Sequence, residues 1–492
     1  MSTVHGLLER HARKDSTKVA LITKSCRLTF LQLNDFSNQM ARYLNNKGLS
    51  KGKKVAILAK NNEYFLFAYF ALLKLGALPI PVNVQFTHEE LNKVFKSLEV
   101  DGLMYQNQFA STVKKLQPMP LVQEIEIAYI NSVNYDNKNL DLFMSSCDPS
   151  EILLTSGTTG VPKGVLFTHN QLLAIASGLS LGFHFTNQDC YLCLMPLTHS
   201  APLNCFFISH LYCGASIILD DFTPKGFLKW IHEEKATFTF AAPIAYQLVS
   251  KDATMSQFNL SSMRVFAYGG SAIPLATYQA VTEVFQNKNF YQVYGLTEAG
   301  PNGSLLNPDE HLTKPGSIGR EPIINMEMKI VTDQGHEAGS GEYGELVMRG
   351  DSLMTGYYNN DEATSAAIQD GWLHTGDIAY RDGDGYMYIV DRLKDVIIPG
   401  GINVYPREIE DVLTRHPLID QACIVGIPDQ EWEETVKAVI VLKPSAVVTV
   451  DELKAFMRQH LAEFKIPRVI RFADSLPHTA SGKVIKEKVK EM

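Results

Sequence analysis

A ten-residue segment, Thr155 to Gly164 (TSGTTGVPKG), combines the residue types that can bind phosphate groups. Its glycines, among them Gly157, allow close backbone approach, and Lys163 adds a positive charge. Four hydroxyls can donate to phosphate oxygens: Thr155, Ser156, Thr158 and Thr159. The segment cannot be aligned with G-x-x-x-x-G-K-[ST], so it is not a Walker A loop. Its composition predicts a phosphate-binding loop and leaves a plain polar loop as the alternative.

Strand-like and helix-like segments alternate on both sides of this loop. Short apolar runs such as VAILA, LPIPVNV, CYLCLM and ASIILD alternate with longer segments of helical period such as NEYFLFAYFALLKLGA. This alternation predicts βαβ units and a buried, largely parallel sheet. The later runs ATFTFAAP, RVFAYGG and NFYQVYG end in small residues or Pro, as strands do when they enter loops at one edge of a sheet. Ligands of open α/β sheets bind beyond such strand ends.

The pattern changes after Pro315 and again near residue 392. Short strand candidates separated by Gly and Asp (MEMKIVTD, GELVMRG, GYMYIVD) predict a β-rich subdomain. The remaining residues contain helix YPREIEDVLTRH, strands QACIVGIP and TVKAVIVLKP, and helix VDELKAFMRQHLAEF. We therefore expect an α/β protein with two domains. Residues 1–391 would form a large N-terminal domain of stacked α/β sheets plus the β-rich subdomain, and residues 392–492 a small α+β domain.

Length, composition and charge restrict the class of protein. The chain of 492 residues exceeds what one hydrophobic core usually serves, and 45% hydrophobic with 20% charged residues is typical of globular proteins. A formal charge of -8 argues against nucleic acid as the main partner. No run approaches the roughly 20 apolar residues that span a bilayer, and the N-terminus lacks a signal-peptide pattern. We expect no integral membrane segment and a cytoplasmic location.

The seven cysteines are scattered and odd in number, which predicts reduced thiols. Cys190 and Cys193 form a C-x-x-C pair inside the apolar string CYLCLMPL. Because no second pair or His cluster accompanies them, the core of a strand is favoured over a metal or redox site.

A series of short motifs follows the phosphate-binding loop in one order along nearly the whole chain. They are PLTH at Pro196–His199, GGS at Gly269–Ser271, YGLTE at Tyr294–Glu298, TGD at Thr375–Asp377, DRLKDVIIPGGINVYPREIE at Asp391–Glu410 and SGKVIK at Ser481–Lys486. With the loop, they resemble the adenylate-forming superfamily, which contains acyl-CoA synthetases, peptide-synthetase adenylation domains and beetle luciferases.

The resemblance implies that ATP is bound at these motifs. The Tyr294 ring would stack on adenine, with Gly270 and Ser271 against the base, and Thr297 would donate to the α-phosphate. The loop at 155–164 would hold the triphosphate, and Lys163 would contribute its charge.

The resemblance also assigns ribose, metal and transition-state roles. Asp377 would accept both ribose hydroxyls, with Arg392 nearby. Glu298 would supply the hard carboxylate oxygen that Mg²⁺ requires. Lys483 would bridge the attacking carboxylate and the α-phosphate while negative charge shifts in the transition state.

A second step would transfer the acyl group to a thiol. In this superfamily the small domain is mobile and swings about a hinge, which matches Lys394 here. The swing would replace the Lys483 face with one bearing Gly400 and Gly401, which leave room for the narrow pantetheine arm of coenzyme A. His199 would act as a gate to the acyl pocket.

The expected function is that of an AMP-forming acyl-CoA ligase, an acid–thiol ligase closest to bacterial fatty acyl-CoA ligases. It would convert a monocarboxylic, fatty acid to acyl-AMP and pyrophosphate, then form a thioester with coenzyme A and release AMP. The pocket segments APLNCFF, FAAP and AGPNG carry no Arg or Lys for a second carboxylate. An aryl-CoA (benzoate-type) ligase and an acyl-AMP ligase loading a separate acyl carrier protein remain alternatives. Thr198 and Pro202 depart from the usual pattern beside the gate, and a monomer or homodimer is expected.

Other members of the superfamily fit less well. Residues 200–207 contain no carboxylate to pair with an amino-acid ammonium group, and Ile398 occupies the place of the second lysine used in luciferase-like oxidation. A degenerate nucleotide sensor would lack Glu298, Asp377 or Lys483, and all three are present.

Overall fold

The structure is a computed structural model that describes residues 3–155, 162–399, 402–429, 432–477 and 484–492. The chain divides into two compact units. Unit 1 contains Met1–Met328 and Val347–His374, and unit 2 contains Lys329–Leu346 and Thr375–Met492. The predicted small domain, residues 392–492, lies within unit 2, which also takes in part of the β-rich region. A domain boundary at residue 391 stays a prediction.

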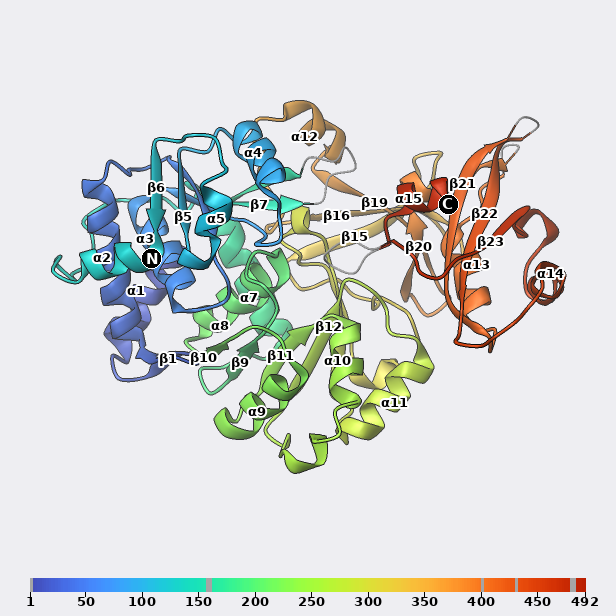
Figure 1. The fold of residues 1–492 in the computed structure, drawn as a ribbon, viewed down its shortest axis with the longest axis horizontal. Helices are drawn as coiled ribbons and strands as arrows, with labels where there is room; N and C mark the ends of the chain where they lie inside the picture. Colours follow the sequence, from blue (N-terminus) through green and yellow to red (C-terminus); the bar gives the residue numbers. More distant parts are fainter. Residues whose placement is uncertain (1–2, 156–161, 400–401, 430–431, 478–483) are drawn as a thin grey trace. The chain divides into compact units, whose positions relative to one another are not determined.

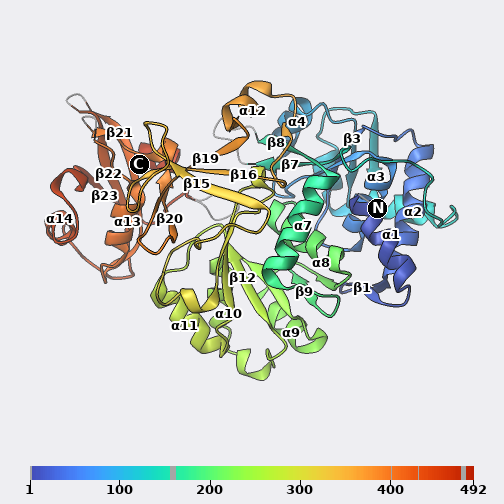
Figure 2. The same ribbon diagram turned by 180° about the vertical axis from the view of Figure 1, so that it is seen from behind.

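The largest sheet of unit 1 follows the order β14-β13-β12-β11-β9-β10-β1-β2 (Figures 1 and 2). Neighbours from β13 through β12, β11, β9 and β10 to β1 are parallel, whereas β2 and β14 pair antiparallel at the two edges. The strands are β1 (Val19–Ile22), β2 (Arg27–Thr29), β9 (Cys190–Cys193), β10 (Ser216–Leu219), β11 (Phe238–Ala241), β12 (Val265–Gly269), β13 (Phe290–Tyr294) and β14 (Ser304–Leu306). The predicted α/β fold with a buried parallel sheet is confirmed.

Helices cover both faces of this sheet. One face packs against α9 (Pro224–Glu234), α10 (Pro243–Ser250) and α11 (Leu275–Phe285), where Phe227, Tyr246 and Phe285 join Phe266 of β12 in one buried cluster. On the other face, Phe183 of α7 (His169–Phe183) lies edge-on to Phe238 of β11, with ring centroids 5.5 Å apart. The helix α8 (Ile208–Cys213) follows on the same face.

A second parallel sheet of unit 1 has the order β4-β3-β5-β6. Its helix α3 (Glu63–Leu75) is buried along almost its whole length, as expected for a helix that is apolar on all sides. Gly76 ends α3 in the left-handed conformation, with φ +68°. The other elements of this region are α1 (Val4–Lys14), α2 (Phe30–Asn46), β3 (Lys54–Leu58), β4 (Leu78–Pro81), α4 (His88–Ser97), β5 (Gly102–Tyr105), α5 (Ala110–Val113), β6 (Leu121–Glu124) and α6 (Ile125–Ser132).

The phosphate-binding loop connects two strands of a small antiparallel sheet with the order β17-β8-β7. The strands are β7 (Pro149–Thr155), β8 (Lys163–Thr168) and β17 (Gly356–Tyr357). Thr155 at the end of β7 pairs with Lys163 at the start of β8, so the two strand ends that the loop joins are held opposite one another. This register fixes the base of the loop on paired strands.

The β-rich region and the C-terminal segment follow the predicted order of elements. The strands β15 (Met326–Val331), β16 (Gly344–Gly350), β18 (Ile368–Gln369), β19 (Trp372–Arg381) and β20 (Met387–Arg392) form one sheet, with α12 (Asp361–Ala367) between β17 and β18 in sequence. In unit 2, a buried cluster that includes Ile409, Ile424 and Leu453 lies between α13 (Pro406–Thr414), β21 (Ile419–Asp429), β22 (Glu433–Leu442), α14 (Val450–Arg458) and β23 (Val469–Phe472). The helix α15 (Lys486–Glu491) packs through Val489 on a second cluster with Cys423 and Val439. The predicted helices and strands of this segment are therefore present.

Helix α14 is shorter than its sequence pattern predicts. It ends at Arg458, and a 3₁₀ turn at Glu463–Lys465 replaces the last predicted turn. Pro467 accounts for the extended conformation of Ile466, because a proline disfavours helical geometry in the residue before it, but it lies nine residues beyond Arg458 and does not explain the end of α14 there.

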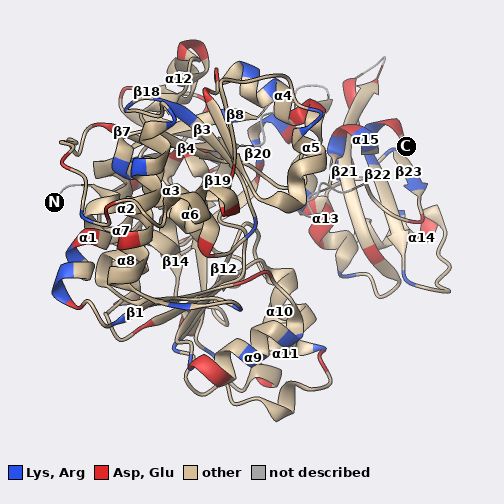
Figure 3. Cartoon of the chain, turned by 60° about the vertical axis from the view of Figure 1, so that its left-hand side comes forward, with Lys and Arg blue, Asp and Glu red and all other residues tan. Residues whose placement is uncertain are grey.

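Acidic and basic residues are interspersed along the ribbons of both units (Figure 3). Among the described helices, none is long and apolar enough to cross a membrane.

Candidate active site

The predicted nucleotide residues follow the carboxyl ends of neighbouring parallel strands. Strand β12 leads into Gly270, and β13 ends at Tyr294 and leads into Thr297. Because β12 and β13 are parallel, with Gly269 opposite Val293, Gly270 and Tyr294 are brought to the same edge of the sheet. This edge is where open α/β sheets bind ligands.

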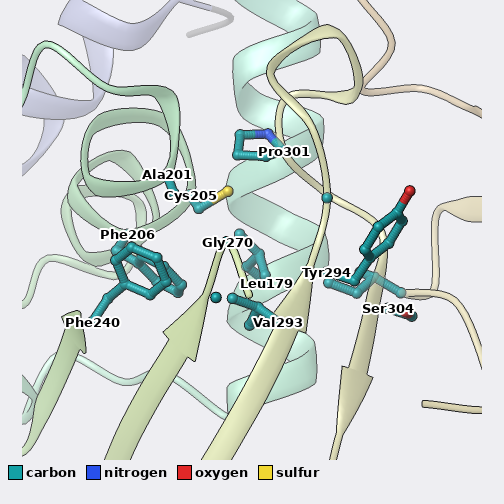
Figure 4. Close-up of a pocket in the computed structure, with 13 residues that line it drawn as sticks. Leu179, Ala201, Cys205, Phe206, Phe240, Gly270, Val293, Tyr294, Pro301 and Ser304 are labelled. Atoms are coloured by element: carbon teal, nitrogen blue, oxygen red, sulfur yellow. The ribbon is translucent and has the colours of Figure 1, made fainter. Parts of the chain in front are cut away.

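A cavity at this edge brings the nucleotide and acyl residues together (Figure 4). It contains about 370 Å³ of empty space, including space that opens to solvent. Tyr294 lies on one side of the cavity and Phe206 with Phe240 on the other, while Gly270 lies between them. Gly270 has φ +83°, a conformation that favours glycine. Ser271 follows it and is exposed.

Each of the three segments predicted to line the acyl pocket contributes to the cavity. Cys205 and Phe206 come from APLNCFF, Phe240 from FAAP and Pro301 from AGPNG. The first segment forms a π-helix, Ala201–Phe207, with Pro202 in its first turn. Proline is tolerated there because the first N–H groups of a helix have no partner inside the helix. A π-turn was not predicted, although such turns often occur at functional sites.

The gate segment is tied to the YGLTE motif by one hydrogen bond. The hydroxyls of Ser200 and Thr297 lie 2.9 Å apart. His199, the residue before Ser200, is exposed, and its backbone N–H donates to the Pro196 carbonyl at 3.1 Å. The structure therefore places the predicted gate histidine next to a residue that contacts Thr297.

Glu298, predicted to bind Mg²⁺, lies in the 3₁₀ turn Thr297–Ala299 and accepts a hydrogen bond from Tyr357. The Tyr357 hydroxyl is 2.8 Å from Glu298 Oε1. The Lys163 ammonium lies over the Tyr357 ring, with Nζ 4.6 Å from the centroid. Burial raises the pKa of Tyr357, and the Glu298 carboxylate raises it further, so Tyr357 is a neutral hydrogen-bond donor. One tyrosine thus joins the predicted metal carboxylate to the predicted phosphate lysine.

Asp377 and Arg392 pair within unit 2. They are opposite residues on the antiparallel strands β19 and β20, and Arg392 Nε lies 2.7 Å from Asp377 Oδ1. The Asp377 side chain is 5% exposed and Arg392 is 48% exposed, so the guanidinium shields the carboxylate from solvent. The structure therefore joins the two residues that the resemblance places at the ribose.

The segment after Lys483 is anchored beside the predicted hinge. The Lys486 ammonium lies 3.1 Å from Asp395 Oδ2 and 3.8 Å from Asp391 Oδ1. Burial opposes the charged form of Lys486, but the carboxylates of Asp391, Asp395 and Glu410 outweigh it and raise the pKa of the ammonium. Lys394 lies between Asp391 and Asp395, in the 3₁₀ turn Leu393–Asp395.

Several predicted site residues lie outside the described residues. They are Ser156, Gly157, Thr158, Thr159, Gly400, Gly401 and Lys483. Their roles stay predictions.

The cysteine pair is confirmed as part of a buried strand, β9. Burial raises the pKa of both Cys190 and Cys193 to about 12, so both are neutral thiols.

Tyr357 and Ser200 were not among the predicted site residues. Ser200 follows the PLTH motif directly and could have been included by proximity. Tyr357 is 59 residues from Glu298, in the run TGYYNN, and local sequence gives no reason to choose it over Tyr358.

The chain is similar to known proteins over almost its whole length. The family model described as AMP-binding enzyme matches residues 8–358, and the AMP-binding enzyme C-terminal domain matches residues 408–483. The chain is 32% identical over 486 residues to a feruloyl-CoA synthase of Amycolatopsis sp., covering 98% of this chain and 97% of that protein. It is 32% identical over 493 residues to a 2-succinylbenzoate–CoA ligase of Geobacillus sp. (strain WCH70), covering 100% and 98%.

Solved structures of CoA synthetases have a similar fold. The o-succinylbenzoate CoA synthetase of Bacillus subtilis, in complex with its acyl-adenylate intermediate, is 28% identical with a TM-score of 0.88, covering 99% of this chain and 98% of that chain. A Mycobacterium tuberculosis fatty acyl CoA synthetase is 28% identical with a TM-score of 0.83, covering 100% and 98%.

Fold and site together define an AMP-forming CoA ligase, an enzyme class that uses ATP, coenzyme A and Mg²⁺. The chain belongs to the AMP-binding enzyme family, within the adenylate-forming superfamily.

Proposed function

We propose that the protein activates a monocarboxylic acid, in the first place a fatty acid, and transfers its acyl group to coenzyme A. The observation that carries this proposal is the shared cavity of Tyr294, Gly270 and the apolar residues around Phe206 and Phe240. An adenine ring on Tyr294 and an acyl group against the two Phe rings would place the reacting carboxylate and α-phosphate between them, near Thr297.

The proposed reaction has two steps, adenylation and thioester formation. A carboxylate oxygen of the acid attacks the α-phosphorus, the bond to the β-phosphate oxygen breaks, and pyrophosphate leaves. The thiol of coenzyme A then loses its proton and attacks the acyl carbonyl, and the carbon–oxygen bond to AMP breaks. No covalent intermediate on the protein is needed, so the residues act by position and charge.

Glu298 fits a role in binding Mg²⁺. Proteins usually bind this ion through one or two carboxylates together with substrate phosphates. Among the residues that the structure describes there is no cluster of three or more His, Cys, Asp or Glu suited to a metal, so the phosphates would supply the other ligands. The ion would screen the repulsion between the carboxylate and the triphosphate. Glu298 holds the ion, and Thr297 donates to the α-phosphate.

The lining of the cavity supports an acid with an uncharged apolar tail. None of its thirteen described lining residues is Lys, Arg, His, Asp or Glu, and apolar side chains such as Leu179, Val293 and Phe240 form most of it. A second carboxylate would therefore lose its hydration without gaining a partner there, which is costly. This favours monocarboxylic over dicarboxylic acids.

An aryl acid is the second candidate. Phe206 and Phe240 are stacked, with ring centroids 4.8 Å apart and 29° between the planes, and can pack against an aromatic acyl group. The similarity to a feruloyl-CoA synthase favours the same class. Transfer to an acyl carrier protein instead of coenzyme A, the cytoplasmic location and the oligomeric state remain predictions.

A panel of acids tests the proposal. AMP release in the presence of ATP, Mg²⁺ and coenzyme A would be measured with fatty acids of increasing length, benzoate, ferulate, and a dicarboxylic acid. We expect the highest kcat/KM with a fatty acid. A highest value with ferulate or benzoate would move the assignment to the aryl class. If no acid of the panel supports exchange of pyrophosphate into ATP, adenylation itself would be refuted.

Phe240→Leu is expected to separate the two acid classes. Leucine keeps an apolar wall but removes the ring that faces the acyl group. If an aryl acid packs on this ring, its kcat/KM should fall roughly 2- to 10-fold. The kcat/KM of a fatty acid should change little, since its packing does not need an aromatic partner.

Phe266→Leu serves as the control for this change. Phe266 is a buried ring of the neighbouring strand that packs on the opposite face of the sheet, in the cluster with Tyr246. It should reduce stability without changing the ratio of aryl to fatty kcat/KM. An equal change of that ratio in both variants would contradict the packing of the acyl group on Phe240.

A further inference from the structure

Tyr357 contacts two oppositely charged residues at the phosphate end of the site. Its hydroxyl donates to Glu298 Oε1 at 2.8 Å, and its ring centroid is 4.6 Å from Lys163 Nζ. Lys163 and Glu298 form no ion pair within 4.0 Å in the part of the chain that the structure describes. The tyrosine therefore contacts both charges, which do not contact each other.

We propose that Tyr357 is a positioning residue that keeps Lys163 and Glu298 apart and directs one carboxylate oxygen of Glu298 toward the cation that accompanies the triphosphate. The inference rests on the proposed function, because it takes Glu298 as the carboxylate that binds Mg²⁺ and Lys163 as a phosphate ligand.

The backbone of Tyr357 is held on both sides, which fixes the direction of its side chain. Tyr357 pairs with Val165 of β8, and its N–H donates to Thr364 Oγ1 at 2.9 Å. Lys163 lies two residues before Val165 and therefore on the same face of the sheet, diagonal to Tyr357. The preceding Gly356 has φ +156°, and a Cβ there would lie 2.8 Å from the Thr364 side chain. The turn thus requires glycine, and Tyr357 is aimed along the face that carries Lys163.

The opposite charges of Lys163 and Glu298 give the Tyr357 ring a role as a spacer between them. Opposite charges attract strongly where water is partly excluded, and both Lys163 and Glu298 are half-buried. Without the ring, Lys163 and Glu298 are expected to pair with each other. This ion pair would weaken the binding of the cation by Glu298 and of the phosphate by Lys163. With the ring present, the Lys163 ammonium rests on a neutral π surface, which holds it more weakly than a carboxylate would.

The hydrogen bond also restricts the Glu298 carboxylate. Tyr357 occupies Oε1, and no described residue donates a hydrogen bond to Oε2. The bond has one polarity, because the Tyr357 hydroxyl donates and a carboxylate oxygen of Glu298 accepts. One ordered oxygen suits Mg²⁺, which demands near-ideal octahedral geometry.

Binding measurements on variants test the proposal. Calorimetry with a non-hydrolysable ATP analogue, in excess Mg²⁺ and separately in EDTA, would compare wild type with Tyr357→Phe and Tyr357→Leu. Phenylalanine keeps the ring over Lys163 and removes the hydroxyl. We expect it to weaken binding about tenfold in Mg²⁺, the effect of one hydrogen bond to a charged group, and to leave binding in EDTA unchanged. Raising the Mg²⁺ concentration should restore exchange activity.

Tyr357→Leu removes the spacer as well. It should weaken binding in EDTA too, because Lys163 would then pair with Glu298. Tyr358→Phe is the matched control: Tyr358 contacts another lysine, Lys54, with its hydroxyl 3.2 Å from Nζ and its ring centroid 5.3 Å away. Binding should be unchanged in this variant under both conditions, and thermal unfolding of each variant would show that it is folded.

Two results would overturn the proposal. One is a folded Tyr357→Phe protein that binds the analogue in Mg²⁺ as tightly as wild type. The other is an equal loss with and without Mg²⁺, which would indicate a general structural role. A wild-type protein whose binding of the analogue does not depend on Mg²⁺, or that catalyses no exchange with any acid, would instead refute the proposed function.

Discussion

Lys483→Ala is expected to abolish acid-dependent exchange of pyrophosphate into ATP while preserving thioester formation from supplied acyl-adenylate. In the proposed function the ammonium would stabilise charge that develops only during adenylation, and loss of such a group costs roughly 10²- to 10³-fold in rate. The thioester step starts after pyrophosphate has left and is predicted to use a different face of the small domain. Lys486, three residues further on, is anchored by Asp391 and Asp395 in unit 2.

Lys394→Pro is expected to give the opposite result. Residue 394 lies in a 3₁₀ turn, whose φ is close to the value that proline fixes, although a proline there disfavours the helical geometry of the preceding Leu393. A rotation between the two steps needs backbone dihedrals at this position to change, and proline restricts both its own φ and the residue before it. Exchange should persist and thioester formation should fall.

Both steps would be measured separately for each variant, with Lys488→Ala as the control. Lys488 is an exposed lysine of α15, five residues from Lys483, and its loss should affect neither step. Equal loss of both steps in Lys483→Ala and in Lys394→Pro would contradict the domain-rotation account.

A second large effect is expected on stability, from Glu151. This residue is fully buried on β7, and its Oε2 accepts a hydrogen bond from the Tyr69 hydroxyl at 2.7 Å. Burial raises the pKa of the carboxyl from 4.5 to about 7, although the hydrogen bond from Tyr69 opposes the shift. Glu151 lies on the strand that leads into the phosphate-binding loop, so the state of its proton bears on the base of that loop.

The direction of the pH dependence follows from the raised pKa. Between pH 4.5 and about 7, native Glu151 keeps a proton that the unfolded chain has lost, so the free energy of unfolding falls as the pH rises through this window. The contribution is complete below pH 4.5 and absent above about 7. A shift of this size corresponds to roughly 3 kcal/mol.

Glu151→Gln removes this titration. We expect the variant to gain up to about 3 kcal/mol relative to wild type between pH 4.5 and 8, seen as a relative rise of a few degrees in Tm by calorimetry. His169 and His210, whose pKa values burial lowers to about 4, titrate with the opposite sign but cancel when the two proteins are compared at the same pH.

A companion variant, Tyr69→Phe, checks the assignment. It removes the hydrogen bond that stabilises the Glu151 carboxylate, so the window should extend to higher pH. A difference in Tm between Glu151→Gln and wild type that stays constant from pH 4.5 to 8 would show that Glu151 does not titrate there.

The sequence by itself determined the class of fold, the order of the motifs and the class of enzyme. Strands such as β9 and β13, the buried helix α3 and the C-terminal elements follow from hydrophobic period and from Gly and Pro at their ends, which act within a few residues. The loop at 155–164 and the YGLTE motif are also local, so their resemblance to the adenylate formers could be recognised without a structure. The acid could not be identified, because the recognised motifs are those predicted to bind ATP and not the acyl group.

Only the tertiary structure decided which residues meet. The contact of Tyr357 with Glu298 and Lys163 depends on the pairing of β17 with β8, and the stacked rings of Phe206 and Phe240 depend on a π-helix packing against a sheet. Such contacts join residues far apart in sequence, and their geometry is set by strand register and side-chain packing, which local patterns do not encode. For the same reason, the early end of α14 at Arg458 was not predicted from the helical period.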